Sequence, residues 1–129
     1  MSFDWREFLT LAEELYTHPD QYCSTEASFR SATSRAYYAA FQCAYEFACE
    51  EGFEPVYGES SHSYLQRHFS HHPRSNPVYR KISVQLNRLR ALRVQADYSA
   101  TLKGSPQFMA SSAIGMAKIV LDCLQQLRG

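Results

Sequence analysis

The sequence predicts an all-α protein, an antiparallel up-down bundle of four to five helices. Its apolar residues recur three and four positions apart and almost never alternate, which is the period of an amphipathic helix and not of a strand. Asn76-Pro77 and Ser105-Pro106 each place a capping residue before a proline, as at the start of a helix. The segments between the predicted helices are short, so neighbouring helices are expected to pack antiparallel.

The chain is long enough for one hydrophobic core. Its 129 residues are 45% hydrophobic and 20% charged, close to the globular average and far from the composition of disordered chains. A chain of this length buries roughly two thirds of the surface that its unfolded form exposes, which suffices for one core but not for two. We therefore expect a single domain over residues 1–129.

Two helices are predicted in the N-terminal half of the chain. The first spans about residues 2–17, with Ser2 as its expected N-cap. The apolar face of this helix contains Trp5, Phe8, Leu9, Ala12, Leu15 and Tyr16. The second spans about residues 24–51 and is ended by Gly52. The face of the second helix contains Phe29, Ala32, Ala36, Ala40, Cys43 and Phe47.

Three further helices are predicted after Gly52. A short one spans about residues 61–69, before Pro73 interrupts its pattern. The fourth spans about residues 77–98 and the fifth about residues 106–127. The apolar stripe of the fifth is wider than one packed face requires, so we expect this helix either at the centre of the bundle or in a subunit interface.

The sequence predicts a cytoplasmic protein. We find no apolar run of the ~20 residues that cross a bilayer. The start of the chain, Met1-Ser2-Phe3-Asp4-Trp5, lacks the charged head and the apolar body of a signal peptide. We therefore expect no contact with a membrane.

The cysteines and histidines do not indicate a metal or a cofactor. Cys43, Cys49 and Cys123 lie in helical patterns, no Cys-x-x-Cys motif occurs, and His71-His72 has no further ligands nearby. We expect buried, reduced thiols, no metal site and no cofactor.

Charged residues are segregated along the chain although the net charge is zero. Residues 1–59 contain eleven acids and three arginines, whereas residues 60–96 contain seven arginines and lysines, four histidines and no acid. Arginine can hold phosphate through two hydrogen bonds, so a cluster without carboxylates favours an anionic ligand such as RNA or a nucleotide. The alternative is that this basic stretch pairs with the acidic half of the same chain or of a second subunit.

Arg93 is the basic residue with the most unusual position. Steps of three and four from Ile82 through Leu86 and Leu89 reach Arg93, so an arginine occupies the apolar line of its helix. Asp97 lies one turn later and can pair with it, although an exposed pair of this kind contributes at most about 1 kcal/mol. The pair either closes the end of the helix or holds an arginine that points into a cleft.

Three short motifs are similar to those of a known family. They are Arg35-Ala36-Tyr37-Tyr38-Ala39-Ala40-Phe41, Ser61-His62 and Arg93-Val94-Gln95-Ala96-Asp97-Tyr98. In their order and spacing they resemble the HEPN superfamily, and most of all its small stand-alone branch, the UPF0332 group. The resemblance covers residues 24–127, which is most of the chain.

The resemblance implies a helical bundle that dimerises and brings two copies of an arginine-containing motif to one cleft. Many members of the family are metal-independent ribonucleases or toxins, often encoded with a small nucleotidyltransferase antitoxin. Others bind nucleotides or act as scaffolds. The ribonuclease motif is an arginine, four to six residues and a histidine. In this chain Arg93 matches the arginine, while Tyr98 stands at the position of the histidine.

Tyrosine changes the chemistry that this motif can perform. Cleavage by a 2′-hydroxyl needs a group that exchanges a proton near neutral pH, and histidine, with a reference pKa of about 6.5, is such a group. Tyrosine has a reference pKa of about 10, so Tyr98 can donate a hydrogen bond to phosphate but is a poor base. A second arginine-histidine spacing, Arg67 to His72, lies before Pro73 and away from the motif.

The motifs define the candidate site residues. The candidate catalytic residues are Arg93, Asp97 and Tyr98, and the candidate ligand-binding residues are Arg35, Tyr38, His62 and Arg90. Adjacent tyrosines point about 100° apart on a helix, so Tyr37 fits the core, while Tyr38 and Arg35 fall near one exposed edge. His62 either faces the same cleft as Arg93 or is hydrogen-bonded to the backbone of its own helix.

Three functions are compatible with these patterns. The first is a dimeric HEPN-type module that binds RNA, a nucleotide or an acidic partner such as an antitoxin. The second is a metal-independent ribonuclease toxin whose motif carries Tyr98 in place of histidine. The third is a helical bundle with a purely structural role in protein interaction.

Overall fold

Residues 2–54, 60–71 and 76–129 are described in a computed structural model of the protein, and in this part of the chain every regular element is an α-helix. The five helices, in chain order, are α1 (Glu7–Thr17), α2 (Thr25–Glu50), α3 (Ser61–Ser70), α4 (Pro77–Tyr98) and α5 (Pro106–Arg128). The predicted all-α fold is confirmed.

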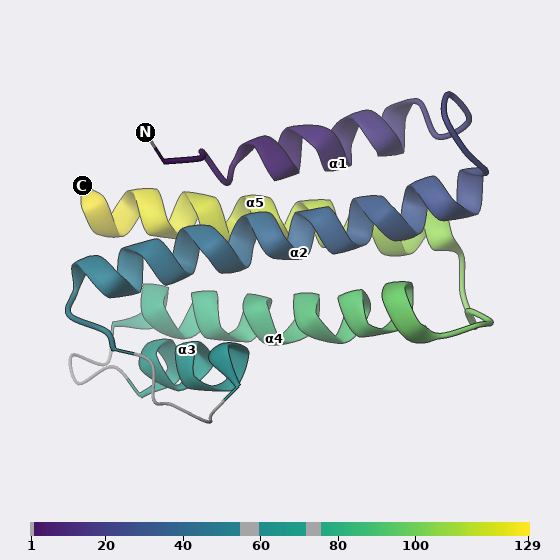
Figure 1. The fold of residues 1–129 in the computed structure, drawn as a ribbon. Coiled ribbons are helices and arrows are strands. Elements are labelled where there is room, and N and C mark those ends of the chain that lie inside the picture. The colour runs from purple at the N-terminus through teal and green to yellow at the C-terminus, as the bar shows by residue number, and fades with distance from the viewer. Residues whose placement is uncertain (1, 55–59, 72–75) are drawn as a thin grey trace.

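The four long helices run alternately in opposite directions (Figure 1). α2 and α5 pack against each other in the middle of the molecule, with α1 on one side of them and α4 on the other. The short α3 lies against the first half of α4 and also contacts α2. The molecule is therefore an antiparallel up-down bundle to which α3 adds a small side layer.

The first helix begins later than the sequence suggested. α1 begins at Glu7, and Ser2 is not its N-cap. The Asp4 side chain instead accepts the backbone N–H of Arg6 at 3.0 Å, and the Asp4 carbonyl accepts the backbone N–H of Glu7 at 3.0 Å. These bonds form a turn, so Trp5 lies before the helix and not on its face.

The other helix boundaries agree with the prediction within one residue. α2, α3, α4 and α5 each follow a residue whose side chain accepts a backbone N–H of the first turn, at 2.8 to 3.2 Å. These four N-caps are Ser24, Ser60, Asn76 and Ser105. Gly52 has a φ of 93°, a left-handed conformation that favours glycine, and it lies just after the end of α2. Pro73 lies outside the described residues.

The core depends on small residues of α2. Ala32, Ala36, Ala40 and Ala44 are completely buried, and the facing helix α5 also buries several alanines. Small side chains let two helix backbones approach closely, which fixes the position of the neighbouring tyrosines of α2. The apolar residues of α5 contact α1, α2 and α4, so this helix is central to the bundle.

The burial of the cysteines and the composition of α5 both differ in part from what the sequence predicted. Cys123 is buried, Cys43 is half-buried, but Cys23 and Cys49 are exposed, so the prediction of buried thiols was wrong for these two. All four are free. Among the described residues, α5 is the one helix whose length and composition would allow it to cross a membrane. Such a composition is also typical of a core helix, and 44% of its most apolar window is buried inside the bundle.

Candidate functional site

Arg93 lies among aromatic rings contributed by α2 and α4. Its guanidinium carbon is 5.5 Å from the ring centroid of Tyr37, 5.6 Å from that of Tyr38 and 5.7 Å from that of Tyr98. These are distances at which a cation is attracted to the face of a ring. The Arg93 side chain is only 15% exposed, as its position on the apolar line predicted. We refer to the following residues as the Arg93 cluster: Tyr37, Tyr38, His62, Arg93, Asp97 and Tyr98.

Arg93 and Asp97 form the ion pair that their spacing predicted. Nη1 of Arg93 donates to Oδ2 of Asp97 over 3.2 Å, and the hydroxyl of Ser34 on α2 donates to the same oxygen over 3.2 Å. The Asp97 side chain is 31% exposed, so the pair contributes at most about 1 kcal/mol to stability. Its main effect is to orient the guanidinium at the junction of α2 and α4.

The charge of Arg93 is retained despite its burial. Burial lowers the pKa of Arg93, but hydrogen bonds with Tyr98 and Asp97 and the electrostatic interaction with Tyr38 outweigh it, and the pKa lies above the ordinary arginine value. The cluster therefore holds a permanent positive charge near the protein surface.

His62, the first buried residue of α3, joins the cluster through Tyr37. Its Nδ1 lies 2.8 Å from the Tyr37 hydroxyl, so its partner is a side chain of α2 and not the backbone of its own helix. Burial, followed by the positive charges of Arg90 and Arg93, lowers the pKa of His62 to about 4, while the Gln66 side chain has the opposite effect. The imidazole is therefore neutral at physiological pH. Burial likewise raises the pKa of Tyr37 to about 12.

The remaining candidates lie at the edge of the cluster. Tyr37 is 3% exposed and belongs to the core, as predicted, while Tyr38 is half-buried. The guanidinium carbon of Arg35 is 5.1 Å from the centroid of the Tyr38 ring, which places Arg35 and Tyr38 at the same edge. Arg90 is exposed on α4, one turn before Arg93. The structure thus brings Arg93, Asp97, Tyr98, Tyr38 and His62 together where α2, α3 and α4 meet, with Arg90 one turn away on α4. Arg35 lies at the outer side of the Tyr38 ring, and its guanidinium carbon is 4.7 Å from the ring centroid of Phe8 on α1.

Two buried nitrogen atoms in this region lack a hydrogen bond of normal geometry. They are Nε of Arg93 and Nε2 of His62, the two such side-chain atoms among the described residues. A buried polar group without a partner costs about 1–3 kcal/mol, so folding alone does not favour this arrangement. Unsatisfied groups of this kind often mark functional sites.

Arg30 is a residue of this region that the sequence analysis did not identify. Its guanidinium donates to the carbonyls of Ala96 and Ser99, at 3.0 and 2.6 Å, and pairs with Glu26 at 2.9 Å. It therefore neutralises the negative C-terminal end of α4. Its i,i+4 spacing from Glu26 was visible in the sequence, but its partners at the end of α4 are 66 and 69 positions away and no local pattern indicates them.

The basic stretch does not pair extensively with the acidic half of the chain. Within the described ranges, the exposed cations Arg80, Lys81, Arg88 and Arg90 form no ion pair, whereas His68 pairs with Glu51. Internal pairing with the acidic half is thus seen at His68 on α3, whose partner Glu51 lies at the end of α2. Arg74 and His72 lie outside the residues that the structure describes.

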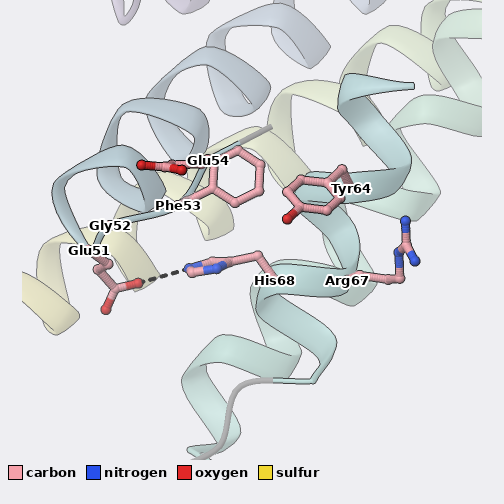
Figure 2. A pocket seen from close by; sticks show the side chains of 7 residues that line it. All are labelled: Glu51, Gly52, Phe53, Glu54, Tyr64, Arg67 and His68. Carbon is pink, nitrogen blue, oxygen red and sulfur yellow. Dashed lines mark hydrogen bonds and ion pairs between the residues drawn. The ribbon is translucent and has the colours of Figure 1, made fainter. Parts of the chain in front are cut away.

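A pocket of about 470 Å³ lies between the C-terminal end of α2 and α3 (Figure 2). Glu51 and Phe53 line one side of it, and Tyr64, Arg67 and His68 of α3 line the other. Nε2 of His68 lies 3.1 Å from one carboxylate oxygen of Glu51, and the hydroxyl of Tyr79 donates to the other. Since both oxygens have partners, Glu51 has the properties of a structural hydrogen-bonding group that links the end of α2 to α3 and α4.

The Arg93 cluster can bind an anion or a planar ring, but it presents no accessible imidazole. No protein-family model, curated protein or solved structure matches the chain. Among the described residues, no group of three or more histidine, cysteine or acidic side chains has the arrangement of a metal site. A proposal about function therefore has to be argued from the geometry of the Arg93 cluster.

Proposed function

We propose that the protein is a HEPN-type module that binds RNA or a nucleotide, and that it does so as a homodimer in the cytosol. The supporting observation is that Arg93 lies beside the rings of Tyr38 and Tyr98, with Arg35 on the Tyr38 ring and the exposed Arg90 one helical turn before Arg93. Guanidinium groups bind phosphate, and aromatic rings bind bases, so the two kinds of side chain together fit a nucleotide. From the resemblance to the HEPN superfamily we further propose a small nucleotidyltransferase-type antitoxin as a protein partner.

The charges near the cluster support an anionic ligand. Arg90 is exposed and has no ion pair among the described residues, so it does not have to give up an existing partner when it binds phosphate. Asp97 is the acid that faces the cluster, and it is already shared between Arg93 and Ser34. The local potential around the rings is therefore positive, which favours phosphate.

We propose that the protein binds RNA or a nucleotide without cleaving it, because the cluster offers no accessible general base. A general base must reach the 2′-hydroxyl within about 3 Å. Nε2 of His62 is buried, and its Nδ1 is occupied by the Tyr37 hydroxyl, so this imidazole does not reach a substrate at the surface. The ribonuclease with Tyr98 in place of histidine is the second candidate, because Tyr98 is exposed and its ring lies beside the Arg93 guanidinium.

The test is a salt titration of binding to a fluorescein-labelled single-stranded RNA. Wild-type protein should bind at low salt and lose affinity steeply as salt rises. Arg90→Gln should weaken binding several-fold and reduce the salt slope by about one, because one phosphate contact is lost. Arg128→Gln is the matched control, since it removes an arginine paired with Glu50 at the far end of α5, and it should leave the slope unchanged.

Two results would contradict the proposal. If the wild-type protein does not bind RNA at low salt, a purely structural role in protein interaction becomes the better explanation. Cleavage of the RNA in the presence of EDTA, lost in Arg93→Ala, would show the ribonuclease instead. Sedimentation of the same sample reports whether the protein is a dimer.

A further inference from the structure

Tyr98 is an exposed ring that is nevertheless held in place. It is the last residue of α4, and 74% of its surface is exposed. The Arg93 guanidinium carbon lies 5.7 Å from its centroid, a distance at which a cation is attracted to the face of a ring. A ring that is already restrained loses less conformational freedom when a ligand stacks on it. Tyr22, which is 83% exposed, has no such guanidinium among the described residues.

The surroundings of Tyr98 favour a ligand that carries phosphate. The carbonyl groups at the end of α4 would normally repel an anion, but Arg30 donates to the carbonyls of Ala96, Ser99 and Ala100. Arg35 lies beyond the neighbouring Tyr38 ring, which Arg93 also contacts. The ring is thus bordered by positive charge although it lies at a helix C-terminus.

We infer that Tyr98 is a stacking platform for an unpaired base, with the flanking phosphates held by Arg35 and Arg90. This inference rests on the proposed RNA-binding function and assigns Tyr98 a role other than proton transfer. Arg93 is held by Asp97 and by three rings, so it positions the platform. Stacking uses the face of the ring and is tolerant of sequence, because every base has such a face.

Three RNA probes and three variants test this role. The probes are a short labelled single strand, the same strand in a duplex and the same strand with its bases replaced by abasic residues. Tyr98→Ala should weaken single-strand binding roughly tenfold, the usual effect of losing one stacked base, whereas Tyr98→Phe should keep it within about twofold. Tyr22→Ala is the control for an exposed tyrosine, and its affinity should equal that of the wild type.

The probes separate failure of this inference from failure of the proposed function. Wild-type protein should prefer the single strand to the abasic strand, and Tyr98→Ala should remove that preference without changing duplex binding. If all variants bind the single strand and the abasic strand equally, the surface binds phosphate only and the platform is ruled out, while the RNA-binding function stands. Loss of binding in Tyr98→Phe would also rule out stacking, because the ring is retained. If no RNA binds the wild type, the proposed function itself fails.

Discussion

Two groups of polar residues, one near each end of the packed length of α2 and α4, differ in how many of their polar atoms have hydrogen-bond partners. At the end near Glu51, both carboxylate oxygens have a partner, His68 on one and Tyr79 on the other. In the Arg93 cluster, Nε of Arg93 and Nε2 of His62 are buried without a hydrogen bond of normal geometry. The first group has the features of a site optimised for stability, and the second retains polar groups that stability alone does not explain.

The exposure of the aromatic residues shows the same difference. At the Glu51 end, Tyr79 and Phe69 are buried against each other, with centroids 5.8 Å apart. In the Arg93 cluster, Tyr38 is half-buried and Tyr98 is largely exposed, although both lie beside a guanidinium. Aromatic residues are therefore packed in the core at the Glu51 end, whereas in the Arg93 cluster two tyrosine rings are accessible from the solvent.

The largest expected effect concerns His62 and pH. Its pKa is about 4 in the folded protein and about 6.5 when unfolded, so the unfolded chain binds more protons between these values. The free energy of unfolding should therefore fall, by on the order of 3 kcal/mol, as pH decreases from about 6.5 through 4. Chemical denaturation across this range, with His62→Gln as the comparison, measures the effect. Parallel pH profiles for the two proteins would contradict it.

The Glu51 end should be more sensitive than the cluster to loss of one tyrosine hydroxyl. Tyr79→Phe removes a donor to a carboxylate and should lower the free energy of unfolding by about 2 kcal/mol, because hydrogen bonds to charged groups are the stronger ones. Tyr37→Phe removes a bond between neutral groups and should cost about 1 kcal/mol. Urea denaturation at pH 7 gives both values. If Tyr37→Phe lowers the free energy of unfolding more than Tyr79→Phe does, the Glu51 end is not the more sensitive of the two.

The smallest expected change in stability is that of Asp97→Asn. Asparagine keeps an acceptor for Ser34 and Arg93 but removes a charge that is 31% exposed, so the loss should be below about 1 kcal/mol. RNA affinity at low salt should rise about twofold, because a carboxylate no longer opposes phosphate. Loss of binding while the protein stays folded would contradict this expectation and would show that orientation of Arg93 requires the charge of Asp97.

The fold class and most helix boundaries follow from local sequence signals. Four of the five helix starts have a Ser or Asn cap, two of them followed by proline, and these are local signals that need no tertiary contact. The first helix start was not predicted, because the Asp4 side chain bonds Arg6 and makes a turn that competes with an earlier cap. The ion pair of Arg93 with Asp97 was also local, one turn apart on one helix.

The residues around Arg93, by contrast, are brought together by the packing of helices that are distant in the chain. Tyr37 and His62 meet because α3 packs beside α2, and Arg30 reaches Ala96 across 66 positions of the chain. Helical periodicity indicates which face of a helix is buried, but it does not indicate which residue of another helix lies opposite. The sequence therefore predicted the helices and the unusual arginine, and the packing of α2, α3 and α4 created the site around it.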